Sequence, residues 1–101
     1  MLKAVYGSRP GDEEKIRFYL NRFAKETDKE LVADYNKQAK LGFVGVHQQM
    51  LFMLAVHYEF IKRFGESPVV VEDHGGIKIL DTKGEIVIED GRIRYLENKA
   101  D

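Results

Sequence analysis

The chain has 101 residues, of which 44% are hydrophobic and 33% charged, and its formal net charge at pH 7 is −1. This length and composition are typical of one globular domain rather than of a fibrous or disordered chain. A net charge near zero gives no global field that would attract nucleic acid or an anionic membrane. The chain has no cysteine, which excludes disulfide bonds and thiolate metal sites.

The N-terminal segment, residues 1–11, contains no apolar run of signal-peptide length, so the expected location is cytoplasmic. Its first six residues suit a short strand or a helical turn, and both alternatives stay open. Gly7, Pro10 and Gly11 then interrupt the chain. Asp12 and the two glutamates after it predict a helix that Asp12 caps and whose first turn carries acids favoured by the helix dipole.

The helical part is expected to span residues 12–65 and to contain three helices. The first extends to about Lys25, because apolar residues recur at helical spacing along it. The run that starts at Thr27 matches a capping box, in which two side chains satisfy free main-chain amides, so a second helix begins there. Gly42 is well placed to end this helix in a left-handed cap, and Gly65 can do the same for the third.

The longest apolar periodic segment, residues 44–64, predicts a third helix on which the other elements pack. Between Met50 and Ile61 only His57 and Glu59 are polar. A membrane span needs about 20 predominantly apolar residues, so this shorter run belongs inside a soluble fold and no membrane contact is expected. One wide face of the helix is expected to lie in the core: Val46, His47, Met50, Met53, Leu54, His57, Tyr58, Ile61 and Phe64.

Phe52 and Val56 interrupt the polar side of this helix with large apolar groups. An exposed apolar patch needs a cover, and a two-fold copy is the commonest cover for a small protein. We therefore predict a homodimer, or a complex with another protein, through a surface that includes Phe52 and Val56 and has Gln49 and Arg63 at its rim. The alternative is that the first helix or the N-terminal segment covers both side chains within the same chain.

Residues 68–96 change to an alternating pattern, which predicts a meander of four short strands. Asp90-Gly91 predicts a tight two-residue turn. The pairs that this turn sets are Ile86 with Tyr95, Val87 with Arg94, Ile88 with Ile93, and Glu89 with Arg92. The preceding strand would continue the apolar face by pairing Ile79 with Ile86 and Ile77 with Ile88. The register of the first hairpin, around His74, stays open.

The expected fold class is therefore α+β, with three helices, the third central, packed on one face of a four-stranded antiparallel β-meander. Residues 1–101 are expected to form a single domain, in which the tail at 97–101 is frayed. We predict that six residues join the central helix and the sheet in one core: Leu54, Ile61, Ile79, Ile86, Ile88 and Tyr95.

A resemblance to known proteins extends from residue 31 to residue 64. It consists of Leu31, Tyr35-Asn36 and Gly42-Phe43, followed by a long helix with Leu51, Leu54, Glu59 and an aromatic-rich end. This arrangement resembles a class of small uncharacterised bacterial proteins. The resemblance implies a bacterial setting and no particular activity.

Two groups of ionisable residues are candidates for chemistry, since imidazole is both a general acid or base and a metal ligand. His47 and His57 lie about three helical turns apart. They cannot share a metal ion, so no metal or cofactor is expected. Glu72, Asp73 and His74 precede two glycines, and there a carboxylate could orient the imidazole while the glycines let a ligand approach. Polar, glycine-rich hairpin ends are also common without any function.

The most favoured function is a small protein-interaction or regulatory module that acts as a homodimer, and an enzyme is less favoured. The alternative is a small hydrolase-like or ligand-binding protein with its site at Glu72, Asp73 and His74. An exposed edge strand is the next candidate interface. Nucleic acid is not an expected partner, because interleaved acids cancel the basic residues of the first two helices: Lys15, Arg17, Arg22, Lys25, Lys29, Lys37 and Lys40.

Overall fold

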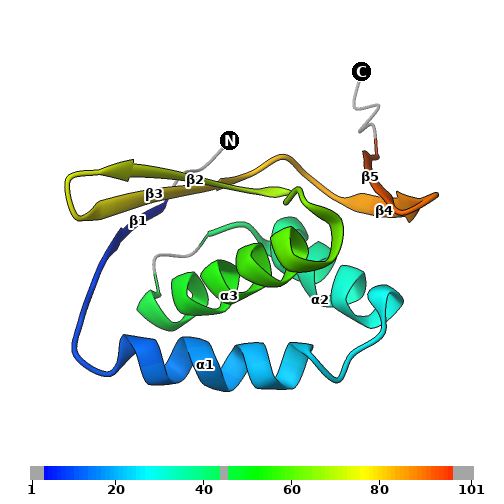
Figure 1. Cartoon of the computed structure of the whole chain (residues 1–101). Helices are drawn as coiled ribbons and strands as arrows, with labels where there is room; N and C mark the ends of the chain where they lie inside the picture. The colour runs from blue at the N-terminus through cyan, green and yellow to red at the C-terminus, as the bar shows by residue number, and fades with distance from the viewer. Residues whose placement is uncertain (1–3, 44–45, 97–101) are drawn as a thin grey trace.

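The chain forms an α+β structure, and the computed structural model describes residues 4–43 and 46–96 (Figure 1). Within these residues one strand is followed by three helices and four strands, so the three predicted helices are confirmed. The predicted frayed tail lies outside the described residues. The elements are β1 (Ala4–Gly7), α1 (Asp12–Phe23), α2 (Asp28–Leu41), α3 (His47–Phe64), β2 (Val69–His74), β3 (Ile77–Thr82), β4 (Ile86–Glu89) and β5 (Arg92–Tyr95).

The described strands form two antiparallel sheets, so the prediction of one four-stranded meander is wrong. One sheet has the order β1-β3-β2, and β4 and β5 form a separate hairpin. The N-terminal segment, for which strand and helix were both open, takes the place beside β3 that β4 was expected to fill. Ile79 therefore lies opposite Val5 instead of Ile86, and Ile77 lies opposite Gly7 instead of Ile88.

The connection between β3 and β4 turns the chain away from the first sheet. Gly84 in this connection has φ +95°, a conformation that favours glycine. The Tyr35 hydroxyl donates to the Gly84 carbonyl at 2.7 Å. The Asn36 amide pairs with the main chain of Ile86, accepting from its N–H and donating to its carbonyl, both at 2.9 Å. The Asn36 side chain of α2 therefore forms main-chain hydrogen bonds with β4 of the kind that a neighbouring strand would form.

Both hairpin turns place positive φ angles where tight turns require them. Asp90 and Gly91 have φ +52° and +74°, and the predicted register of the β4–β5 hairpin is confirmed. Gly75 and Gly76 form the corresponding turn between β2 and β3. This turn sets the register that the sequence left open, with His74 opposite Ile77.

α3 lies between the three-stranded sheet and α1, and α2 lies beside it under the β4–β5 hairpin (Figure 1). Because α3 is covered on two sides, its buried surface differs from the single face that was predicted. Among the predicted core positions Val46, Tyr58 and Ile61 are exposed. The buried residues of α3 are Met50, Leu51, Met53, Leu54, Ala55, Val56, Glu59 and Phe60.

One hydrophobic core joins the helices to both sheets. Of the six residues predicted to share it, Leu54 and Ile86 are fully buried, and Ile88 and Tyr95 are partly buried against it. Ile61 lies on the exposed side of α3, so its predicted place in the core is wrong. Ile79 is half-buried on the outer face of the sheet.

Local signals at the helix ends were mostly correct. The capping box between Thr27 and Glu30 is present, and Gly65 ends α3 in the left-handed conformation. Gly42 ends α2 with φ +77° and ψ 176°, which is not a left-handed cap. The N-cap of α1 is Gly11, because the Asp12 side chain turns inward. Among the described residues no helix is both long and apolar enough to cross a membrane.

Candidate functional site

Phe52 and Val56 are covered by α1 of the same chain. Val56 is fully buried, and the ring centre of Phe52 lies 5.2 Å from those of Tyr19 and Phe23, in edge-to-face contacts. The alternative that α1 covers this side of α3 is therefore the one observed. Phe52 and Val56 are consequently removed from the candidate contact surface.

Arg63 and Gln49, the predicted rim, connect helices inside the chain. The Arg63 guanidinium donates to the carbonyls of Phe23 and Glu26 at 2.7 and 2.8 Å, and to the buried Glu59 carboxylate at 2.8 Å. It thereby holds the end of α1 against α3. The Gln49 amide donates to the Gly42 carbonyl at 2.9 Å, at the end of α2. Of the four residues predicted for this surface, Val56 is fully buried, and Gln49, Phe52 and Arg63 are partly buried in contacts within the chain.

Glu72, Asp73 and His74 lie in solvent at the end of the β2–β3 hairpin. His74 Nε2 is 3.3 Å from a Glu72 carboxylate oxygen, and Asp73 accepts from the Lys78 ammonium. Alternation along β2 puts Glu72 and His74 on the outer face of the sheet and Asp73 on the other face. The three residues therefore do not converge on one point.

Within residues 4–43 and 46–96 no helix lies over the outer face of the three-stranded sheet (Figure 1). Alternation along the strands places Val5, Ile77, Ile79 and Val70 on this face, since Tyr6 and Leu80 of the opposite face are buried against the core. Val5 is 61% exposed and Ile77 47% exposed. The sheet thus presents an apolar surface with Glu72 and His74 beside it, and we call these six residues the outer sheet face.

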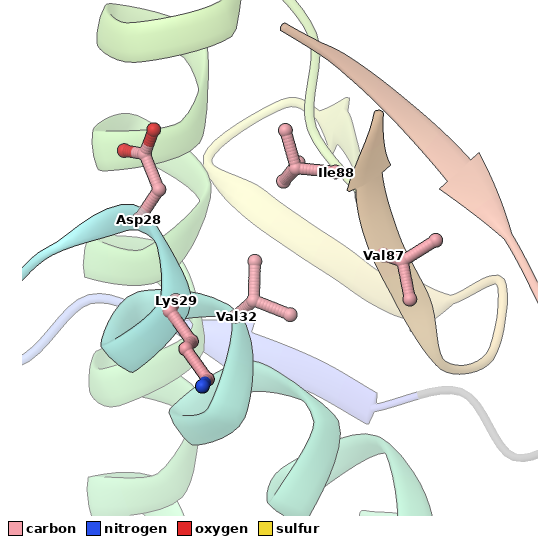
Figure 2. Close-up of a pocket in the computed structure, with 5 residues that line it drawn as sticks. All are labelled: Asp28, Lys29, Val32, Val87 and Ile88. Atoms are coloured by element: carbon pink, nitrogen blue, oxygen red, sulfur yellow. The ribbon is translucent and has the colours of Figure 1, made fainter. Parts of the chain in front are cut away.

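A shallow apolar groove of about 360 Å³ separates α2 from β4. Figure 2 shows the Val32 and Ile88 side chains pointing into this space from opposite sides, with Asp28 and Lys29 at the α2 end. At this groove the β4–β5 hairpin, which is separate from the three-stranded sheet, packs against α2. The charged residues in its lining, Asp28 and Lys29, both come from α2.

His47 and His57 bind different partners. The His57 Nδ1 lies 3.0 Å from the Val69 carbonyl, and burial lowers the pKa of the His57 imidazole despite this contact. The His47 Nε2 lies 3.0 and 3.1 Å from the two carboxylate oxygens of Asp12. Within the described residues no group of three or more histidine and acidic side chains is arranged to hold a metal ion.

Asp12 is the centre of a buried polar cluster that the sequence did not predict. Its carboxylate also accepts from the Tyr6 hydroxyl at 2.7 Å and from the Arg9 main-chain N–H at 2.8 Å. Burial alone raises the pKa of the Asp12 carboxyl, but the hydrogen bonds from Tyr6, His47 and Arg9 outweigh it and lower the pKa from 3.8 to about 2. The carboxylate therefore stays ionised at neutral pH and fixes His47. The local sequence signal for this cluster was the run of acidic residues at the start of α1, and the same run also predicts that Asp12 caps the helix.

A second carboxyl group is perturbed at the turn between α1 and α2. Glu26 lies 3.6 Å from the Arg22 guanidinium, which also contacts Asp34 at 3.4 Å. The Glu26 Oε1 atom is buried and has no hydrogen-bond partner among the described residues. Burial, and secondly the neighbouring Asp34 carboxyl, raise the pKa of Glu26 from 4.5 to about 7.

The raised pKa of Glu26 predicts a pH dependence of stability. The Glu26 carboxyl keeps its proton up to about pH 7 in the folded chain, but loses it above about pH 4.5 in the unfolded chain. The contribution of Glu26 to the free energy of unfolding is therefore fully present below about pH 4.5 and is lost as the pH rises towards about 7. In Glu26→Gln we expect the part of the pH dependence between about pH 4.5 and pH 7 to disappear. Urea unfolding at several pH values measures it, with the exposed Glu13→Gln as control. An unchanged slope in Glu26→Gln would contradict the assignment.

No protein-family model, curated protein or solved structure matches this chain significantly. The structure therefore defines the class as an α+β protein with a three-stranded sheet and a separate hairpin around a central helix. The resemblance to small uncharacterised bacterial proteins stays a prediction. Its residues Tyr35 and Asn36 hold the connection between the two sheets.

Proposed function

We propose that the protein is a small cytoplasmic protein-interaction module that acts as a homodimer through the β1 edge of the outer sheet face. The observation that carries this proposal is the exposure of Val5 and Ile77 on a sheet face that none of the described helices covers. A contiguous apolar patch on a sheet of this kind is a usual site of protein contact. The proposal keeps the homodimer that the sequence favoured and moves its contact surface from α3 to the sheet.

Among the described strands none pairs with the outer edge of β1, and this edge supports a second copy as the partner. In a hairpin closed by two residues the flanking pair exchanges main-chain hydrogen bonds, so His74 bonds Ile77 and the bonding alternates along β3. The main-chain groups of Lys78 and Leu80 then face β1, and those of Val5 and Gly7 face outward. An antiparallel β1 from a second copy can pair with them about a two-fold axis.

Such a contact joins the two outer sheet faces into one apolar surface. Val5 is central to it, because its main chain lies at the free edge and its side chain on the exposed face. Glu72 and His74 then lie at the rim. Polar side chains at the end of the hairpin are expected at the rim of a protein contact, and they need no catalytic role there. The ligand-binding alternative at Glu72, Asp73 and His74 therefore has less support.

The test is the oligomeric state of Val5→Glu. We expect sedimentation velocity to show a dimer for the unmodified chain and a monomer for Val5→Glu, because two like charges placed at the axis would weaken association about a hundredfold or more. Val5 is exposed, so the variant should stay folded.

Phe18→Glu is the matched control, since Phe18 is 62% exposed and lies on α1, away from the sheet. We expect this variant to remain dimeric. A monomeric unmodified chain, or equal dimerisation of all three proteins, would contradict the proposal.

A further inference from the structure

A hollow of about 670 Å³ lies between the loop that follows β1 and the start of α3. Pro10 and Leu51 add apolar surface to a polar lining that comes from Arg9, Asp12, Lys15, His47 and Gln48. A second hollow of about 370 Å³ adjoins Arg9 and His47 as well. These two residues therefore lie between two hollows at the end of the molecule where α1 and α3 begin.

Arg9 and Lys15 have no acidic partner among the residues that the structure describes. In contrast to Arg22, Arg63, Arg92 and Arg94, neither Arg9 nor Lys15 forms an ion pair within residues 4–43 and 46–96. Asp12 is the acidic residue in the lining of the larger hollow. Its carboxylate accepts hydrogen bonds from Tyr6 and the Arg9 main chain and contacts His47. Two cations against this one carboxylate leave the lining of the hollow with a net positive charge.

His47 is held in one orientation at the wall of both hollows. Its ring stacks on Tyr6 with centres 5.4 Å apart and planes inclined by 16°, and its Nε2 is fixed by Asp12. Its side chain keeps 19% exposure. Because Nε2 binds Asp12, the imidazole has Nδ1 for a further hydrogen bond. A ring held in one orientation beside two exposed cations is suited to position a ligand as well as to attract one.

We propose that this hollow binds a small organic oxyanion, a phosphate monoester or a carboxylate with an apolar body. Arg9 and Lys15 bind the charged oxygens, Arg9 through the planar fork of its guanidinium. Pro10 and Leu51 contact the apolar body, and His47 fixes its orientation. This site is separate from the outer sheet face and goes beyond the proposed homodimer.

The probes are phenyl phosphate, benzoate, inorganic phosphate and, as an uncharged counterpart, benzyl alcohol. Each is titrated into the full chain at low salt, and chemical shifts of main-chain amides are recorded. We expect saturable shifts at Gly11, Gln48 and neighbouring residues with phenyl phosphate or benzoate. Weaker binding is expected for inorganic phosphate, which lacks the apolar body, and none for benzyl alcohol. Comparison of phenyl phosphate with benzoate shows which oxyanion the site prefers.

Arg9→Gln and Lys15→Gln should each weaken binding of the preferred probe about tenfold, because each removes one charge-assisted contact. Arg17→Gln is the matched control, since Arg17 lies on α1 but does not line either hollow. It should leave the affinity unchanged. The absence of saturable binding by both organic anions, or an equal loss in Arg17→Gln and Arg9→Gln, would overturn the proposal. Neither result depends on the oligomeric state.

Discussion

Replacing Leu54 with alanine is expected to lower the free energy of unfolding by about 2–5 kcal/mol. Leu54 is 1% exposed and lies at the middle of α3, which the sheet covers on one side and α1 on the other. The deletion leaves a cavity that neither layer can fill without moving main chain. Urea unfolding followed by circular dichroism measures the change.

Ile61→Ala on the same helix is the control for Leu54→Ala. Ile61 is 44% exposed, although the sequence pattern placed it on the core face. Its truncation should cost less than about 1 kcal/mol, because no enclosed cavity forms. Equal losses in the two variants would mean that the two-sided burial of α3 is wrong.

Replacing Arg63 with methionine is expected to destabilise the fold by about 3 kcal/mol, since it leaves the buried Glu59 carboxylate without its partner. The change also removes the donors to the carbonyls of Phe23 and Glu26, so the end of α1 loses its attachment to α3. Lys62→Met, at the exposed neighbouring position, should change the stability by less than about 0.5 kcal/mol. Urea unfolding of both variants at one pH gives the comparison.

The double variant Glu59→Leu with Arg63→Met separates the two contributions of Arg63. Removing both charges abolishes the unpaired carboxylate, so the double variant should recover a large part of the loss. A double variant less stable than Arg63→Met would show instead that Glu59 stabilises the fold by other contacts.

Signals contained within a few residues predicted their structures well. The capping box at Thr27, the turn at Asp90-Gly91 and the left-handed Gly65 all depend on neighbouring main-chain groups, so the local sequence determines them. The existence of three helices followed from apolar periodicity in the same way. These parts of the fold need no knowledge of distant partners.

Pairings between distant segments could not be predicted. β3 carries apolar residues on both faces, so β1 and β4 were equally acceptable neighbours by pattern, and the choice depends on Tyr35 and Asn36 of α2. The apolar Phe52 and Val56 did show that α3 needs a second cover, but not that α1 supplies it.

The candidate sites depend on the same long-range arrangement. Asp12 and His47 belong to different helices, and no local pattern relates an aspartate at one helix start to a histidine at another. The outer sheet face exists only because β1 joins β3, which turns Val5 outward. The compact cluster Glu72, Asp73 and His74, in contrast, is a hairpin end whose side chains the strand separates.

The pairing of β1 with β3 has a consequence for the order in which the protein folds during synthesis. The ribosome releases β1 first, but the strand it pairs with emerges only after all three helices. Closing so long a loop is slow compared with forming the β4–β5 hairpin, whose strands are adjacent in sequence. A nascent chain therefore carries its N-terminal strand unpaired until the last third of the chain emerges, and the sheet is completed late.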